Sequence, residues 1–198
     1  MSLTTKDVLL STNSTGAPYV AGDLTIIDLP RHPSMFRTDQ NGPDEGAPIL
    51  VRWTLDRARG QLTEVVLDER GNDFPRINGR HGGQDHRHLY TAHRGDSVEF
   101  GPAMKHDLCR GTTEVHDHGR GHKTSEPVFV RKPGAVAEDE GWIMSCVYDP
   151  DSHRSEVVIL EAQGFLGEPI ATIRLPVRVP VTFHGGRAPD HDAPPPVR

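Results

Sequence analysis

The sequence predicts an all-β fold, and three observations support this: many turn-forming residues, short runs of β-branched residues, and no long stretch with helical periodicity. The 198 residues include 20 glycines and 17 prolines. This composition suits short strands joined by turns better than it suits helices. The length is sufficient for one ordinary domain with its own hydrophobic core.

The first expected strand is Leu24–Leu29, a β-branched run that ends at Pro30. The residues before it are polar and turn-rich, and no periodic pattern occurs in them. We therefore expect residues 1–23 to form a disordered or non-native leader. Propeller-like structure is expected over residues 24–190.

A strand, a turn that begins with Asp and a returning strand occur three times in the rest of the chain. The turns begin at Asp56, Asp107 and Asp149, and the first two end at Gly60 and Gly111. An Asp carboxylate accepts hydrogen bonds from the backbone amides that follow it, and Gly readily adopts the positive φ that closes such a turn. The Asp positions are 51 and then 42 residues apart, close to the roughly 40–50 residues of a propeller blade. The pattern predicts about three blades, with a β-sandwich as the alternative.

Three blades are fewer than the roughly 4–8 of a closed propeller. We therefore expect a partial propeller whose N-terminal blades are missing or come from a partner. Its uncovered flank would expose apolar side chains and promote association. The side chains expected to be exposed are Ile26, Val51, Trp53 and Val65. The proline-rich tail, residues 191–198, is expected to be a surface strap or disordered.

Composition excludes several classes of function. The net charge is −6 with both signs interspersed, so no basic surface for nucleic acid is expected. No nucleophile elbow or nucleotide-binding loop occurs. Cys109 and Cys146 lie far apart, which favours a reduced, cytoplasmic setting. No apolar run is long enough to span a membrane, although peripheral contact with a membrane surface stays compatible with the sequence.

Two groups of histidines and one single histidine are candidates for chemistry. His116 and His118, with His122 and Glu126 after them, have the composition of a two-histidine and carboxylate metal site in a small cupin-like barrel, or of an exposed polar loop. A second group is expected to be solvated: His81, His86, His88 and His93. His184 follows a β-branched strand and precedes two glycines, so it is either a buried core histidine or a metal ligand.

The order of several segments resembles the carotenoid cleavage oxygenase family, which includes apocarotenoid- and stilbene-cleaving dioxygenases. The likeness runs from about Leu24 to Asp190 and covers the C-terminal two-fifths or so of a family member. The segments are Asp73–Asn78, Ser125–Val130, Glu138–Trp142, Leu175–Pro180 and Phe183–Gly185.

The resemblance implies a seven-bladed propeller with Fe(2+) held on its axis by four histidines, some of them oriented by glutamates. Of these histidines only the last has a match, His184. Glu126 matches one orienting glutamate, which would accept the second N–H of a ligand histidine. At a second such position the chain has Asp73, a carboxylate one methylene shorter. The family usually continues with Asn and Trp where this chain has Gly186 and Arg187.

The implied reaction is cleavage of a conjugated C=C bond of an apocarotenoid or stilbene-like substrate by O2, giving two carbonyl products. The other three ligands would precede Leu24, and residues 1–23 contain no histidine. We therefore expect the isolated chain to be inactive, and its partners to be a hydrophobic polyene or stilbenoid, O2 and the N-terminal blades as a separate chain. The alternatives are an inactive remnant or non-catalytic β-fragment, and the cupin-like barrel. The propeller hypothesis places Glu126 within about 15 Å of His184.

Overall fold

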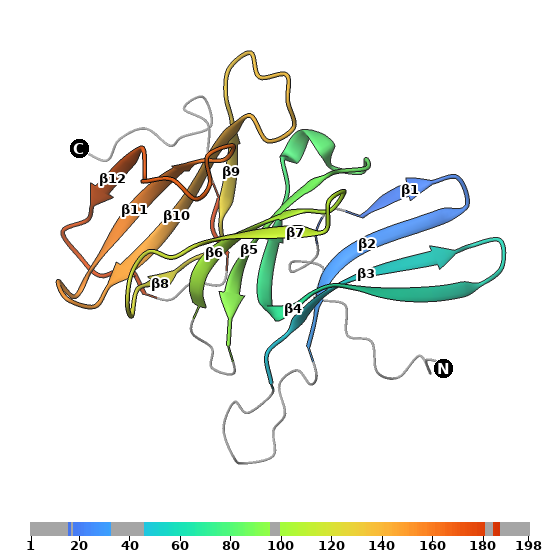
Figure 1. Cartoon of the computed structure of the whole chain (residues 1–198), viewed down its shortest axis with the longest axis horizontal. Helices are drawn as coiled ribbons and strands as arrows, with labels where there is room; N and C mark the ends of the chain where they lie inside the picture. The colour runs from blue at the N-terminus through green and yellow to red at the C-terminus, as the bar shows by residue number, and fades with distance from the viewer. Residues whose placement is uncertain (1–15, 17, 33–45, 96–99, 181–183, 187–198) are drawn as a thin grey trace, which may run out of the picture.

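The computed structural model describes residues 16, 18–32, 46–95, 100–180 and 184–186, and within these the chain is almost entirely β. Seven strands form one antiparallel sheet in the order β1 to β7, and five form a second in the order β12-β11-β10-β8, with β9 also paired to β10 (Figure 1). One short helix, η1, is also found there, and it is far too short and polar to cross a membrane. The bounds are β1 Tyr19–Ala21, β2 Leu24–Arg31, β3 Ile49–Asp56, β4 Gln61–Arg76, η1 Gly79–His81, β5 His88–Arg94, β6 Phe100–Asp107, β7 Thr112–His116, β8 Lys123–Thr124, β9 Val128–Arg131, β10 Gly141–Asp149, β11 Arg154–Glu161 and β12 Ala171–Arg174.

The long strand β4 belongs to two structural units. Its residues up to Gly71 pair with β3, and those from Asn72 onward pair with β5. At the change of partner, a Cβ on Gly71 would lie 1.6 Å from the carbonyl oxygen of Arg94, so the close approach of the two backbones requires glycine. The chain thus forms three antiparallel units, β1 to mid-β4, the end of β4 to β7, and β8 to β12, which follow one another from right to left in Figure 1. This confirms the prediction of a partial propeller of about three blades.

The three predicted Asp turns are present between β3 and β4, β6 and β7, and β10 and β11. In each turn the Asp carboxylate accepts a backbone N–H from two or three residues further along, as Asp56 does from Arg59 at 2.9 Å. Gly60 and Gly111 both have φ of 63°. In the third turn a histidine, His153, adopts the positive φ of 52°.

The first strand corrects the prediction for the leader. Tyr19–Ala21 forms β1 and pairs with Leu24–Ile26 of β2, so disorder over the whole of residues 1–23 is wrong. A three-residue strand is too short to show periodicity in the sequence. Residues 1–15 and 17, and the proline-rich tail 191–198, lie outside the described residues. Strand β2 also continues through Pro30, which is tolerated because β1 does not extend alongside that end of β2.

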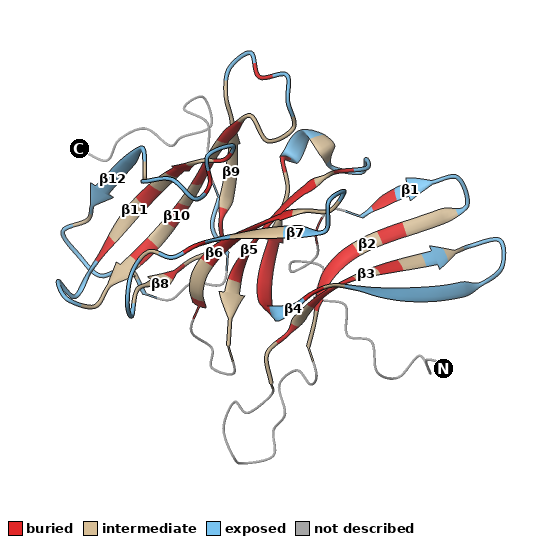
Figure 2. Ribbon diagram, viewed as in Figure 1, coloured by how far each residue is buried: buried red, intermediate tan, exposed pale blue. Residues whose placement is uncertain are grey.

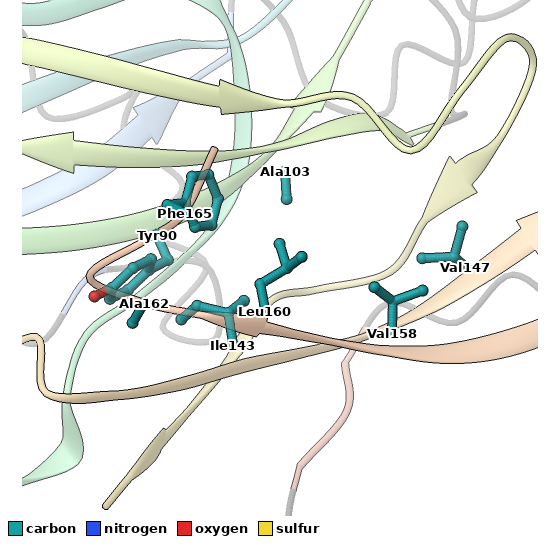
Figure 3. Packing of buried hydrophobic residues seen from close by; sticks show 8 residues of the cluster. All are labelled: Tyr90, Ala103, Ile143, Val147, Val158, Leu160, Ala162 and Phe165. Atoms are coloured by element: carbon teal, nitrogen blue, oxygen red, sulfur yellow. The ribbon is translucent and has the colours of Figure 1, made fainter. Parts of the chain in front are cut away.

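The main hydrophobic core joins the second and third units. It is made of buried side chains that converge from β5, β6, β10, β11 and the segment after β11 (Figure 3). The members of this cluster are Tyr90, Ala103, Ile143, Val147, Val158, Leu160, Ala162 and Phe165. Burial of such apolar side chains is the main favourable contribution to the free energy of folding.

The first unit has a smaller core of its own, and this corrects part of the expected exposure. Val51 and Trp53 pack against Leu29 and are buried, as is Ile26. Leu29, Val51 and Trp53 therefore bury their side chains together on the β2–β3 pair. Val65 is 57% exposed, as predicted, and the outer half of β4 around it is coloured as exposed in Figure 2.

Candidate functional site

Glu126 is a buried carboxylate in the link between β8 and β9. Its side chain is only 2% exposed. The preceding residue fixes this link, because the Ser125 N–H donates to the Cys146 carbonyl at 2.8 Å and the Cys146 N–H donates to Ser125 Oγ at 2.9 Å. Both bonds tie the link to the adjacent strand β10, so the position of Glu126 is set by the sheet.

His184 lies directly against this carboxylate. Its Nδ1 is 3.3 Å from Glu126 Oε1, which confirms the predicted proximity of two residues 58 positions apart. An ionised carboxylate only accepts hydrogen bonds, so in a neutral His184 ring this contact favours the tautomer with the proton on Nδ1 and the lone pair on Nε2. The His184 side chain is 36% exposed. In that tautomer Nε2 is the ring nitrogen that could hold a metal ion.

Phe74 forms an apolar wall beside His184. The two rings meet edge to face with centroids 5.4 Å apart, and Phe74 also packs on Phe100 at 4.5 Å. Phe74 lies in an irregularity of β4 and has φ of 55°, a conformation that costs a non-glycine residue about 1–3 kcal/mol. Its N–H donates to the carboxylate of Asp73 at 2.8 Å, which stabilises this local turn.

The other carboxyl oxygen of Asp73 faces away from this contact. It accepts a hydrogen bond from Arg94 Nη1 at 3.2 Å and lies 3.9 Å from His32 Nε2. Within the described residues no contact joins Asp73 to His184. The structure thus places Asp73 on the same strand as the site but beside a different histidine.

Arg76, at the end of β4, is a site residue that the sequence reasoning did not single out. Its Nε lies 2.7 Å from Glu126 Oε1 and its Nη2 lies 2.8 Å from Oε2. Nη2 also donates to the Gly185 carbonyl at 3.1 Å, while the Gly185 N–H donates to Glu126 Oε2 at 2.9 Å. Arg76 belongs to Asp73–Asn78, one of the segments that resemble the family, and this is the signal in the sequence that could have identified it.

The alternative metal site with His116, His118 and Glu126 is wrong. His116 and His118 do lie together, with ring centroids 4.8 Å apart, and with His122 they line one hollow. However, His116 Nδ1 is hydrogen-bonded to the Phe165 carbonyl at 3.1 Å, and Glu126 is bound elsewhere. Burial, and then the neighbouring histidines, lower the pKa of His118 to about 4. Among the described residues no three His, Cys, Asp or Glu side chains have a geometry that would hold a metal ion.

The expectation that His86 and His88 are solvated is also wrong. His86 is fully buried, with Nε2 3.1 Å from Asp28 Oδ2, and Arg52 Nε donates to the other oxygen of Asp28 at 2.7 Å. Burial works against both charges, but the hydrogen bonds between Asp28 and its partners prevail, so the pKa of Asp28 lies below and that of His86 above its ordinary value. Burial lowers the pKa of His88. The sequence around these two histidines is polar and loop-like, so it gives no indication that they are buried.

Comparison with known proteins finds relatives over most of the chain. The family model described as retinal pigment epithelial membrane protein, RPE65, matches residues 6–187. A carotenoid cleavage oxygenase of Mycobacterium tuberculosis is 36% identical over 175 residues, which are 84% of this chain and 34% of that protein. Isoeugenol monooxygenase of Pseudomonas putida is 30% identical over 83% of the chain and 38% of its own length.

Among solved structures, cobalt-substituted Synechocystis ACO, an apocarotenoid oxygenase, superposes with a TM-score of 0.79 at 28% identity. The match covers 86% of this chain and 38% of that one. The chain therefore spans little more than a third of the length of the relatives that it matches.

Proposed function

Because the chain belongs to the RPE65 family of carotenoid oxygenases, we propose that it forms the C-terminal blades of a non-haem Fe(2+) dioxygenase. The reaction would cleave a conjugated C=C bond, with one atom of O2 ending in each of two carbonyl products. The observation that carries the proposal is the contact between His184 Nδ1 and the buried Glu126 carboxylate at 3.3 Å. A metal-ligand histidine commonly donates its second N–H to such a carboxylate.

The donor set fits one ligand of an iron site. His184 offers Nε2 from a partly exposed ring, and imidazole is a common ligand of Fe(2+). The described residues contain no complete metal-binding cluster, so the remaining ligands would come from the other blades of the propeller. The cobalt named for the Synechocystis structure supports a metal centre in this fold. When bound, Fe(2+) would supply the chemistry of O2.

The chain's own residues would prepare this position. Glu126 would hold the proton on Nδ1 and so fix the tautomer and ring plane of His184. Phe74 and Phe100 would exclude water from one side of the ring, since Phe74 is 2% and Phe100 3% exposed. Asp73, one methylene shorter than glutamate, would orient another ligand histidine only through water.

The proposed substrate is an apolar molecule with a conjugated double bond, an apocarotenoid or a stilbene-like compound. The names of the relatives support this class, since they act on carotenoids, apocarotenoids or isoeugenol. The other proposed partners are O2, the N-terminal blades as a separate chain, and a membrane surface as the source of an apolar substrate. We also propose a cytoplasmic location, which both free cysteines, Cys109 and Cys146, would suit.

The test is to purify the chain with and without N-terminal blades of a family member and to measure bound iron by elemental analysis. With the blades present we expect one iron per complex and O2-dependent cleavage of an apocarotenoid or stilbene. His184→Ala should abolish iron binding, whereas His153→Ala, in the β10–β11 turn, should not. Full iron occupancy in the His184→Ala complex would overturn the assignment. Absence of iron and activity in the unmodified complex would support the alternative, an inactive remnant.

A further inference from the structure

Both backbone polar groups of Gly185 form hydrogen bonds with side chains. Its N–H donates to Glu126 Oε2 at 2.9 Å, and its C=O accepts from Arg76 Nη2 at 3.1 Å. The segment that carries His184 is otherwise a coil with no strand partner in the described residues. Among residues 184–186, these two bonds and the contact from His184 itself are the polar links to the rest of the described structure.

Arg76 and Glu126 act as one unit in this clamp. Nη2 donates a hydrogen bond to Oε2 at 2.8 Å, and Nε lies 2.7 Å from Oε1 as an ion-pair contact without hydrogen-bond geometry. Together the hydrogen bond and the ion pair hold the guanidinium against the carboxylate. Glu126 is buried and lies against both the His184 ring nitrogen and the Gly185 N–H, so the position of its carboxylate determines where these two groups can bind.

The backbone around Arg76 explains why the guanidinium reaches this point. β4 is irregular between Asp73 and Arg76, and Phe74 is held in its left-handed conformation by the hydrogen bond from its N–H to Asp73. Pro75 restricts the chain further, because its ring fixes φ. The irregularity that brings Phe74 against His184 therefore also directs Arg76 toward Glu126.

We propose that Arg76 is a positioning residue for the metal-ligand histidine: it holds the Glu126 carboxylate in place and ties the Gly185 carbonyl to the end of β4. The role rests on the proposed function of His184 as a ligand. Arg76 acts through Glu126 and the backbone, since none of its contacts is to the His184 ring. Lysine would keep the charge but could not reproduce the planar guanidinium, whose Nη2 donates to both Glu126 Oε2 and the Gly185 carbonyl.

The test uses Arg76→Ala and Arg76→Lys in the 198-residue chain, with Arg70→Ala as the matched control. Arg70 is also on β4, is 48% exposed against 43% for Arg76, and also pairs with a buried carboxylate, Asp68. The readouts are amide hydrogen exchange at Gly185 and the His184 tautomer from ¹⁵N chemical shifts. We expect Arg76→Ala to speed exchange at Gly185 at least about tenfold and to mix the tautomers. Compared with Arg76→Ala, Arg76→Lys should bring the His184 tautomer closer to the wild type than it brings the Gly185 exchange rate. Arg70→Ala should change neither.

Unchanged Gly185 exchange and an unchanged His184 tautomer in Arg76→Ala would overturn the proposal. If Arg76→Ala does not fold, Arg76→Lys tests the proposal instead. Exchange at Gly185 as slow as in the wild type would then exclude a role for the planar guanidinium. These readouts need no metal, so they are independent of the iron measurement. Failure of His184→Ala to lose iron would overturn the proposed function while leaving the clamp intact.

Discussion

Oε1 of Glu126 lies 3.3 Å from Nδ1 of His184, although β9 to β12 lie between them in the sequence. Glu126→Ala would leave Arg76, His184 and the Gly185 N–H without their shared acceptor. Because Arg76 and His184 are partly exposed and can be hydrated again, we expect a loss of only about 2 kcal/mol in the free energy of unfolding. Urea denaturation followed by fluorescence measures this.

The matched control for that prediction is Glu156→Ala. Glu156, on strand β11, is also a glutamate paired with an arginine, Arg174, but this pair lies at the surface. Its removal should cost less than about 1 kcal/mol. Equal losses in the two variants would contradict a special role for the buried carboxylate.

What could be predicted from the sequence follows from the range of the interactions involved. The Asp56 and Asp107 turns depend on residues within four positions of each other, so the local sequence is sufficient to predict them. The Glu126–His184 contact was predicted only through the order of family segments. The contacts of Arg76 and the burial of His86 depend on residues 50 to 109 positions away, and no local pattern indicates them.

Gly71 should be intolerant of even the smallest side chain. In Gly71→Ala the new Cβ would lie 1.6 Å from the Arg94 carbonyl oxygen, so β4 and β5 must separate where β4 changes partner. We expect a loss of about 3 kcal/mol or more, measured by thermal or urea unfolding. Gly79→Ala is the control, because its Cβ would meet nothing within 4 Å. A Gly71→Ala protein as stable as Gly79→Ala would show that the crossing of β4 is not tight.

His106 predicts a pH dependence of stability. Burial lowers its pKa to about 4, and its two ring nitrogens are hydrogen-bonded to Thr113 and Thr91. Between pH 6.5 and 4 the unfolded chain binds a proton on His106 that the folded chain does not bind, so stability falls as pH falls through this window. The contribution is about 3 kcal/mol. Titration of the His106 ring signals by NMR measures it, and a midpoint near 6.5 would contradict the prediction.

The exposed apolar side chains predict association of the isolated chain. Val65 and Val66 on the outer half of β4 and Ile173 on β12 are 43–57% exposed, and β12 has a paired neighbour on one side only within the described residues. Exposed apolar patches and open strand edges favour contacts between molecules. We expect size-exclusion chromatography with light scattering to show concentration-dependent oligomers or aggregates. The double variant Val65→Lys and Ile173→Lys should shift the distribution toward monomer, because lysine on an edge opposes pairing. A wild-type chain that stays monomeric at high concentration and unfolds cooperatively would show that these surfaces need no cover.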